Sequence, residues 1–433
     1  MRFNLHDRRT FVMITAVACA FVLIFAAVTA VLAFVLKKDP APAPEPDAEK
    51  EEVKKEVEFD TMNGVWIASI SNIDFPSRPD LSRAELMAEI DSIVETASEC
   101  GLDTIFFQVR PSSDALYDSD IFPVSRYLST DGKLTLDCLD YFIKSAGEKD
   151  ISVHAWINPL RVAVSGTTDT LRDGNPAKEN PELCVKYADG KIYYDCGLPE
   201  VRRLIADGVR EIVENYDVAG VVFDDYFYPY PYYETDEEGN KTVSPFDDDE
   251  TFNEYGTEFD DIGDWRRENV NELVKLCYKT VKKADKGCIF GVSPFGIWKN
   301  GYGDESGSAT KGSQSYFDIY CDTVAWAEGG YVDYIAPQLY WKADNSAASY
   351  TALTEWWNLA LENTGVAFLV SHAAYRYSEW ESPEGIMTSQ VENAMNYDIY
   401  RGSVYYGYEE IYSNAYGIKD ELKALYTDEK ETS

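Results

Sequence analysis

The sequence predicts an α/β fold, an eight-stranded parallel (β/α)8 barrel that follows a single N-terminal transmembrane helix and a disordered linker. Three observations lead to this prediction. From about residue 60, short apolar runs rich in β-forming residues alternate with segments of helical period. Eight such runs occur and are apolar on both faces, which is typical of a parallel sheet covered by helices. Ahead of them, residues 11–36 form an uncharged apolar segment.

The apolar segment at 11–36 is long enough to cross a bilayer as a helix, which takes about 20 residues. Basic residues flank it on both sides, so the charge balance only weakly favours a cytoplasmic N-terminus. We expect residues 1–10 to be a cytoplasmic tail and 11–36 an uncleaved signal-anchor. This places the chain in the cell membrane as a single-pass protein with its barrel outside. Cleavage after the small residues at 27–30 is the alternative.

Residues 37–59 are too rich in Pro, Ala and Glu to build a core. Pro-Ala alternation favours an extended polyproline geometry, and the charged block that follows stays solvated. We expect a stalk that holds the barrel domain, residues 60–428, away from the membrane. Residues 429–433 are expected to be a short C-terminal tail.

The composition excludes several classes of partner. The 433 residues include 39 Lys+Arg and 76 Asp+Glu, a net charge of −37, which repels nucleic acid and anionic lipid. With 31 Tyr, 20 Phe and 9 Trp, the chain is too aromatic to be a disordered acidic protein. It has only 3 His and no C-x-x-C motif, so we expect no metal site. It also lacks a glycine-rich phosphate loop, and we expect no cofactor.

The eight expected strands are set by short β-rich runs bounded by turn residues. They lie at 64–70, 104–110, 151–158, 220–226, 288–295, 334–341, 366–372 and 403–408. The clearest helix between them starts with a capping box, in which Ser82 and Glu85 satisfy each other's backbone donors, and ends at Gly101. Another opens with Pro199, and further helices are expected at 264–284, 349–363 and 383–396.

In a barrel of this kind, functional residues lie where strands end and the following loops begin. Polar and aromatic residues gather at these strand ends, whereas the amino ends of the strands carry no such concentration. The fourth strand ends in the adjacent carboxylates Asp224 and Asp225. The other expected site residues, all candidates for substrate binding, are Arg110, His154, Trp156, Asn158, Tyr226, Tyr228, Gln338, Tyr340, Trp341 and His372.

The Asp224-Asp225 pair is the sharpest chemical signal. Two adjacent carboxylates repel each other, and partial burial raises the pKa of at least one of them. A carboxyl group with a raised pKa can donate a proton to a glycosidic oxygen, while its ionised neighbour orients the substrate or stabilises positive charge. The alternative is structural: one Asp caps the following turn and the other is solvated.

The loop after this strand, 226–261, carries five tyrosines stiffened by Pro229 and Pro231. Planar rings on a stiff loop suit the apolar faces of sugars, because little ordering entropy is lost on binding. Tyr226 and Tyr228 are therefore expected to contact substrate. The alternative is a loop that uses its aromatic residues to pack against itself. His154 is as much a candidate for barrel packing as for ligand contact, and His372 is the better functional candidate.

Six segments resemble the glycosyl hydrolase-like 10 family. They are FFQVRPSSDALYDSDIFPVSRYL (106–128), HAWINPLRV (154–162), FDDYFYPYP (223–231), DWRRENVN (264–271), GVSPFGIWKN (291–300) and YIAPQLYW (334–341). The resemblance implies a TIM barrel that hydrolyses bacterial cell-envelope glycans, peptidoglycan strands in particular. It implies catalysis by Asp224 and Asp225. It places the family's other site residues on Arg110, Trp156, Asn158, Gln338 and Tyr340.

Two mechanisms follow from the residues. In one, a carboxylic acid protonates the leaving oxygen and a second carboxylate attacks or activates water; Glu409, Glu410 and Asp114 are candidates for the second group. In the other, the substrate's own acetamido group attacks, Asp224 orients it and Asp225 is the acid/base. We favour this route because the adjacent Asp pair at this strand end resembles that of acetamido-sugar hydrolases that use it. The competing functional hypothesis is a membrane-tethered protein that binds cell-wall glycan and cleaves nothing.

Overall fold

The computed structural model describes residues 59, 61–235, 239–301 and 306–427, all of which belong to one compact unit, Val57–Ser433. The expected cytoplasmic tail, the signal-anchor at 11–36, nearly all of the linker and the tail at 429–433 lie outside the described residues. Within the described part of the chain, none of the helices combines the length and the apolar character needed to cross a membrane.

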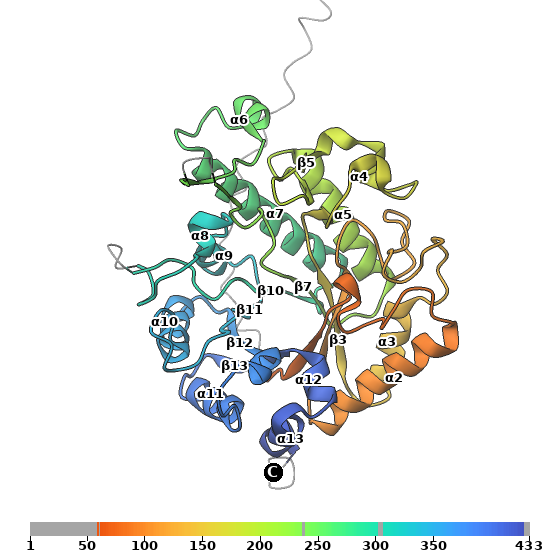
Figure 1. Cartoon of the computed structure of the whole chain (residues 1–433), viewed down its shortest axis with the longest axis vertical. Coiled ribbons are helices and arrows are strands. Elements are labelled where there is room, and N and C mark those ends of the chain that lie inside the picture. Colours follow the sequence, from red (N-terminus) through yellow and green to blue (C-terminus); the bar gives the residue numbers. More distant parts are fainter. Residues whose placement is uncertain (1–58, 60, 236–238, 302–305, 428–433) are drawn as a thin grey trace, which may run out of the picture. The chain divides into compact units, whose positions relative to one another are not determined.

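Eight parallel strands close into a barrel, which confirms the expected fold (Figure 1). Around the barrel the order is β1-β13-β12-β11-β10-β7-β3-β2, so strands that follow one another in this set are neighbours. The strands are β1 (Gly64–Ile67), β2 (Thr104–Arg110), β3 (Ser152–Ile157), β7 (Gly220–Phe223), β10 (Ile289–Val292), β11 (Tyr334–Ile335), β12 (Ala367–Ala373) and β13 (Tyr400–Tyr406). Each overlaps one of the eight predicted runs.

Helices cover the outside of the barrel (Figure 1). The capping box forms as expected: the Ser82 hydroxyl accepts from the backbone of Glu85, whose carboxylate accepts from the backbone of Ser82. The longer helices are α2 (Arg83–Glu99), α3 (Cys138–Gly147), α5 (Pro199–Asn215), α7 (Ile262–Ala284), α10 (Tyr350–Leu361), α11 (Ile386–Ala394) and α13 (Ile418–Thr427). Shorter ones are α4 (Pro176–Glu179), α6 (Asp249–Tyr255), α8 (Ser315–Asp318), α9 (Thr323–Gly329) and α12 (Tyr408–Tyr412).

The barrel interior is filled by its own set of apolar and aromatic side chains, separate from the larger core between strands and helices. Trp66, Phe106, Trp156 and Tyr334 belong to this inner cluster. Close packing of large rings leaves no pore, so the interior forms a solid floor beneath the strand ends.

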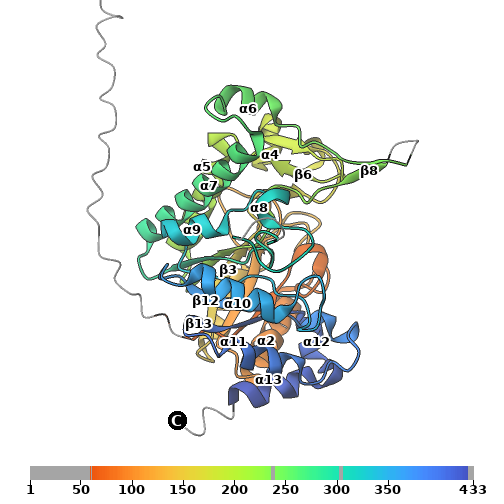
Figure 2. The same cartoon turned by 90° about the vertical axis from the view of Figure 1, so that its left-hand side faces the viewer.

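Long loops after β3 and β7 carry additional structure. The loop after β3 forms a small antiparallel sheet of β4 (Arg161–Ala163), β5 (Cys184–Lys186) and β6 (Ile192–Tyr194), and the loop after β7 forms a hairpin of β8 (Tyr233–Thr235) and β9 (Lys241–Val243). Figure 2 shows β6, β8, α4 and α6 gathered at one end of the domain. Because these loops follow the carboxyl ends of strands, they build up that rim of the barrel.

Candidate active site

Asp224 and Asp225 directly follow β7, and each side chain is only 4% exposed. All four residues of β7 are buried, so an apolar strand delivers two carboxyl groups to the carboxyl end of the barrel. β7 lies between β3 and β10 in the barrel order. The ends of those neighbouring strands therefore flank the pair.

Asp224 is held by donors from β3 and its own loop. Its Oδ2 accepts from the indole nitrogen of Trp156 at 3.0 Å and from the amide nitrogen of Asn158 at 3.2 Å. Its Oδ1 accepts from the backbone N–H of Tyr226 at 3.2 Å. Burial raises the pKa of Asp224 to about 7, Arg161 opposes that rise, and the neighbouring Asp225 adds to it.

Asp225 is held by a different set of donors. The phenol of Tyr230 donates to its Oδ2, and the amide of Gln338 donates to its Oδ1 at 3.0 Å. The same amide also donates to the carbonyl of Ser293 at 3.2 Å, which ties the segment after β11 to the end of β10. Burial raises the pKa of Asp225, whereas the two side-chain donors act to lower it.

Arg161 supplies the cation beside Asp224. Its Nε and Nη2 both donate to the carbonyl of Pro111, at 3.0 and 2.8 Å, and its guanidinium lies 5.0 Å from the ring centroid of Tyr226. Its backbone N–H donates to Asn158 at 2.9 Å. Sequence reasoning did not select Arg161, although it follows Asn158 by three residues within the HAWINPLRV segment.

The two carboxyl groups open into a cavity of about 280 Å³. This volume is close to the lower end of ligand pockets, which run from about 300 Å³. A few polar groups among aromatic walls fit a sugar, whose hydroxyl groups need partners and whose faces are apolar. The lining residues are Trp66, Trp156, Asp224, Asp225, Tyr226, Tyr230, Ser293, Phe295, Gln338, Tyr340, Tyr375 and Tyr406.

Several of these lining residues were missed by the sequence analysis, namely Trp66, Tyr230, Ser293, Phe295, Tyr375 and Tyr406. Trp66 and Tyr406 lie on β1 and β13. No site residue was predicted for β1, and after β13 only Glu409 and Glu410 were, as candidates for a second carboxylate. Tyr406 stacks on Tyr340 with centroids 6.1 Å apart and an interplanar angle of 9°. The hydroxyl of Ser371 accepts from the Trp66 indole at 3.0 Å and lies 3.1 Å from the Tyr340 hydroxyl, which links three strand ends.

The structure places both histidines of the expected site away from this cavity. His154 lies deeper in the barrel, where its Nδ1 is 3.0 Å from the hydroxyl of Tyr334, and burial lowers its pKa to about 3. Trp156, two residues further along β3 and on the same face, is the side chain that reaches the cavity. His372 bonds to Gln390 and Ser403 at 3.0 and 2.8 Å on the outer face of β12, because its neighbour Ser371 takes the inner face.

Arg110 is also brought elsewhere. The β2–β3 register shifts between Gln108 and Arg110, so Arg110 pairs with Ile157 rather than continuing the inward face. Its guanidinium consequently lies over the Phe122 ring, 3.7 Å from the centroid, on the outside of the barrel.

Tyr228 and Trp341 lie close to the site without lining the cavity. Tyr228 turns away from its neighbours Tyr226 and Tyr230 and packs on Phe246 and Tyr320. Trp341 makes an edge contact with the lining residue Phe295, at 5.7 Å between centroids. Trp341 therefore supports the wall from behind.

No group of three or more His, Cys, Asp or Glu side chains that could hold a metal ion occurs among the residues for which the structure gives positions.

A closed parallel barrel whose fourth strand delivers two buried carboxyl groups into an aromatic pocket has the groups that a glycoside hydrolase needs. Residues 61–384 match the family described as Glycosyl hydrolase-like 10, and the chain belongs to this family. Glycosyl hydrolase YngK of Bacillus subtilis (strain 168) is 36% identical over 371 residues, covering 83% of this chain and 71% of that protein. Glycosyl hydrolase DigH of Escherichia coli (strain K12) is 36% identical over 338 residues, which cover 73% of this chain and 74% of that protein.

Among solved structures, the glycoside hydrolase domain of PgaB (BpsB) from Bordetella bronchiseptica aligns with a TM-score of 0.55 at 11% sequence identity. The alignment covers 85% of this chain and 98% of that domain. At this identity the likeness shows the barrel fold.

Proposed function

We propose that this protein is a membrane-anchored extracellular glycoside hydrolase that cleaves the glycan strands of bacterial cell-wall peptidoglycan. The observation that carries the proposal is the pair of buried, adjacent carboxyl groups, Asp224 and Asp225, in a cavity walled by aromatic rings. Membership of a glycosyl hydrolase family supports the reaction class.

We assign the proton to one carboxyl group and the charge to the other. Burial and the charge of Asp225 raise the pKa of Asp224 to about 7, and burial also raises the pKa of Asp225, against which its hydrogen-bond donors act. The protonated member donates to the glycosidic oxygen as the bond breaks. The ionised member orients the substrate's 2-acetamido group, whose oxygen attacks the anomeric carbon. Water then opens the resulting ring, and the first carboxylate takes back a proton.

This substrate-assisted route is favoured by the arrangement of carboxyl groups. Among the described residues, Asp224 and Asp225 supply the carboxyl groups of the cavity wall. Of the other candidates, Asp114 accepts from the backbone of Arg126 in the loop after β2, and Glu409 is exposed on α12. Neither lies in the wall, and nor does Glu410.

We propose a division of roles within the pair that differs from the sequence-based one. The sequence-based assignment made Asp224 the orienting group and Asp225 the acid. Each carboxyl group accepts from two side-chain donors, so these bonds do not separate the pair. What separates the two groups is that burial and the charge of Asp225 raise the pKa of Asp224 to about 7. We therefore assign the proton of the free enzyme to Asp224.

The reaction is tested by incubating the full-length protein with peptide-free peptidoglycan strands and counting new reducing ends. We expect cleavage by the wild type and at least a 100-fold loss in Asp224→Asn and Asp225→Asn, since acid catalysis alone contributes about 10²–10⁴. Glu409→Gln and Glu410→Gln are the matched controls and should retain wild-type rates. Binding without new reducing ends in the wild type would instead support the non-catalytic glycan-binding protein.

An activated aryl glycoside separates the two roles, because a good leaving group needs no proton. Asp224→Asn should retain cleavage of p-nitrophenyl N-acetylglucosaminide, whereas Asp225→Asn should lose it. The reverse pattern would return the acid role to Asp225.

The membrane anchor rests on the apolar segment 11–36. We expect the full-length protein to stay in the membrane fraction after carbonate extraction, and a variant lacking residues 1–36 to be soluble. The intact mass of the membrane-bound protein should include residues 1–36. A mature protein that begins near residue 31 would show cleavage.

A further inference from the structure

A second and larger cavity, of about 810 Å³, lies on the same rim as the carboxyl pair. Its walls come from residues 123–132, in the loop after β2, and 165–173, in the loop after β3. In the barrel order β3 adjoins β7, the strand that delivers Asp224, and β2 adjoins β3 on its other side. A polymer that extends from the carboxyl pair across these loops would meet this cavity, which we call the arginine basin after Arg126 and Arg172 in its wall.

The arginine basin presents two guanidinium groups that are not engaged in ion pairs. Its two acidic residues are each tied to a lysine, Asp131 to Lys133 at 2.6 Å and Asp173 to Lys178 at 2.7 Å. Within the described part of the chain, neither Arg126 nor Arg172 takes part in an ion pair. In a protein with a net charge of −37, two such guanidinium groups in one cavity mark a place that attracts anions.

The two guanidinium groups also have donors to spare. Arg172 uses Nη2 to donate to the carbonyl of Ser129, and among the described residues its Nε and Nη1 have no hydrogen-bond partner. Arg126 is exposed, and its side chain makes no hydrogen bond to a described residue. Planar guanidinium forks match a carboxylate with two parallel hydrogen bonds.

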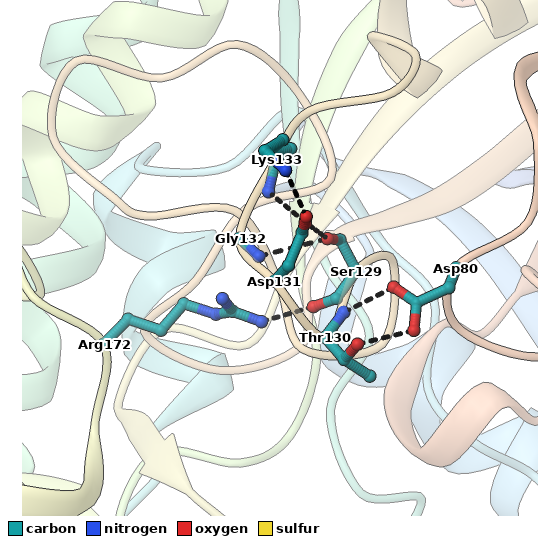
Figure 3. Close-up of polar contacts among 7 residues, drawn as sticks. All are labelled: Asp80, Ser129, Thr130, Asp131, Gly132, Lys133 and Arg172. Carbon is teal, nitrogen blue, oxygen red and sulfur yellow. Dashed lines mark hydrogen bonds and ion pairs between the residues drawn. The ribbon is translucent and has the colours of Figure 1, made fainter.

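The wall of the basin is fixed in place before any ligand arrives (Figure 3). Asp80 accepts from the backbone N–H of Thr130 at 2.7 Å and from its hydroxyl at 2.5 Å. The Ser129 hydroxyl accepts from the backbone of Gly132 at 3.1 Å, and Gly132 has a φ of +80°, which other residues rarely adopt. A turn held on both sides, by Asp80 and by Arg172, loses little freedom when a ligand binds.

We propose that the arginine basin is an anion-binding subsite for carboxylate groups carried by the sugars of the glycan. In a peptide-free wall glycan these are the lactyl carboxylates of muramic acid. This inference rests on the proposed function for the identity of the glycan, but the binding of a carboxylated sugar can be measured without any cleavage.

The test compares two tetrasaccharides with the same sugar backbone. One alternates N-acetylglucosamine with peptide-free N-acetylmuramic acid and carries carboxylates; the other, tetra-N-acetylchitotetraose, has none. Binding is measured by calorimetry with the full-length protein carrying Asp225→Asn, so that neither glycan is consumed. Into this background we introduce Arg126→Gln and Arg172→Gln, singly and together. The control is Arg203→Gln, which removes the same charge from an exposed ion pair with Glu200 on α5.

We expect the carboxylated glycan to bind roughly tenfold more tightly than the chitin tetramer, the usual scale for a charge-assisted hydrogen bond. The double variant should remove this difference without changing the affinity for the chitin tetramer, and Arg203→Gln should leave both affinities unchanged. Added salt should weaken the binding of the carboxylated glycan and leave the binding of the chitin tetramer unchanged.

Equal binding of the two glycans by the parent protein would overturn the proposal, as would an equal loss for both glycans in the arginine variants. Its failure is distinct from failure of the proposed function. If the carboxylated glycan binds preferentially but the wild type releases no reducing ends, the basin stands and the hydrolase assignment falls. If the wild type releases reducing ends but the Asp225→Asn protein binds both glycans with equal affinity, the hydrolase assignment stands and the basin proposal falls.

Discussion

The phenolic hydroxyl of Tyr230 donates a hydrogen bond to Oδ2 of Asp225, five residues before it in the chain. The loop after β7 therefore turns back on the strand that it leaves, and one tyrosine serves two purposes. Its ring lines the cavity, while its hydroxyl favours the ionised form of a buried carboxyl group. Tyr226, which makes an edge contact with Tyr230 at 5.7 Å between ring centroids, lines the same cavity and offers a matched comparison.

Tyr230→Phe should lower kcat by about 10- to 100-fold, because a hydrogen bond to a charged group contributes about 1.5–3 kcal/mol. The ring remains, so KM should change little. Tyr226→Phe removes a hydroxyl that makes no hydrogen bond to the described residues and should keep nearly full activity. Steady-state kinetics on peptide-free strands checks both, and equal losses in the two variants would contradict a specific role for the Tyr230–Asp225 bond.

The pH dependence of kcat/KM should show an alkaline limb near pH 7, where Asp224 loses its proton. Trp156→Phe removes an indole donor that favours the ionised form of Asp224, so the limb should move upward by roughly 0.5–1 pH unit. Trp66→Phe is the control, because the Trp66 indole donates to Ser371 instead. If the alkaline limb of Trp156→Phe does not move, the limb reports the titration of a group other than Asp224.

Asp224 should also make the free energy of unfolding depend on pH. Its pKa is about 7 in the folded protein, against an ordinary value of 3.8 for an unburied Asp, so the folded state binds more protons between these values, and stability falls as pH rises through them. His154 and His372, with lowered pKa values, act in the opposite direction over part of this range. The difference between wild type and Asp224→Asn isolates the aspartate.

Urea unfolding at pH 5 and pH 8 measures this difference. Asp224→Asn should be more stable than the wild type at pH 8, by on the order of 1–3 kcal/mol, because it removes a buried charge. At pH 5 the wild-type carboxyl group is protonated, and the difference in unfolding free energy between the two proteins should become smaller. A gap that is constant with pH would mean that Asp224 does not titrate in this range.

His372 provides a test of a residue that the sequence placed in the binding site. His372→Ala removes two hydrogen bonds and the stacking on Tyr350 and Tyr405, so stability should fall by about 2–4 kcal/mol. KM for the glycan should stay within twofold of wild type, since His372 lies on the outer face of β12. Urea unfolding and steady-state kinetics on the same preparation check this, and a raised KM with unchanged stability would restore the binding role.

The site was partly predictable because some of its residues follow one another along the chain. Asp224 and Asp225 are adjacent at the end of an apolar strand, and Trp156 and Asn158 alternate on one face of the next strand in the barrel. That periodicity suffices to bring the indole and amide donors to Asp224. Arg110 was misplaced because a register shift in β2 reverses which face its side chain takes, and the local pattern does not reveal that shift.

By itself the sequence determined the barrel, its eight strands, the capped helix after Ser82 and the position of the carboxyl pair, because each depends on residues close together in the chain. Only the tertiary structure decided that Tyr230 and Gln338 hold Asp225, that Trp66 and Tyr406 complete the cavity, and that Arg126 and Arg172 share the arginine basin. Most of these groups come from different strand ends and loops. Closure of the barrel and the packing of its long loops bring these groups together. The periodicity of a single segment cannot predict such contacts between residues that are far apart in the chain.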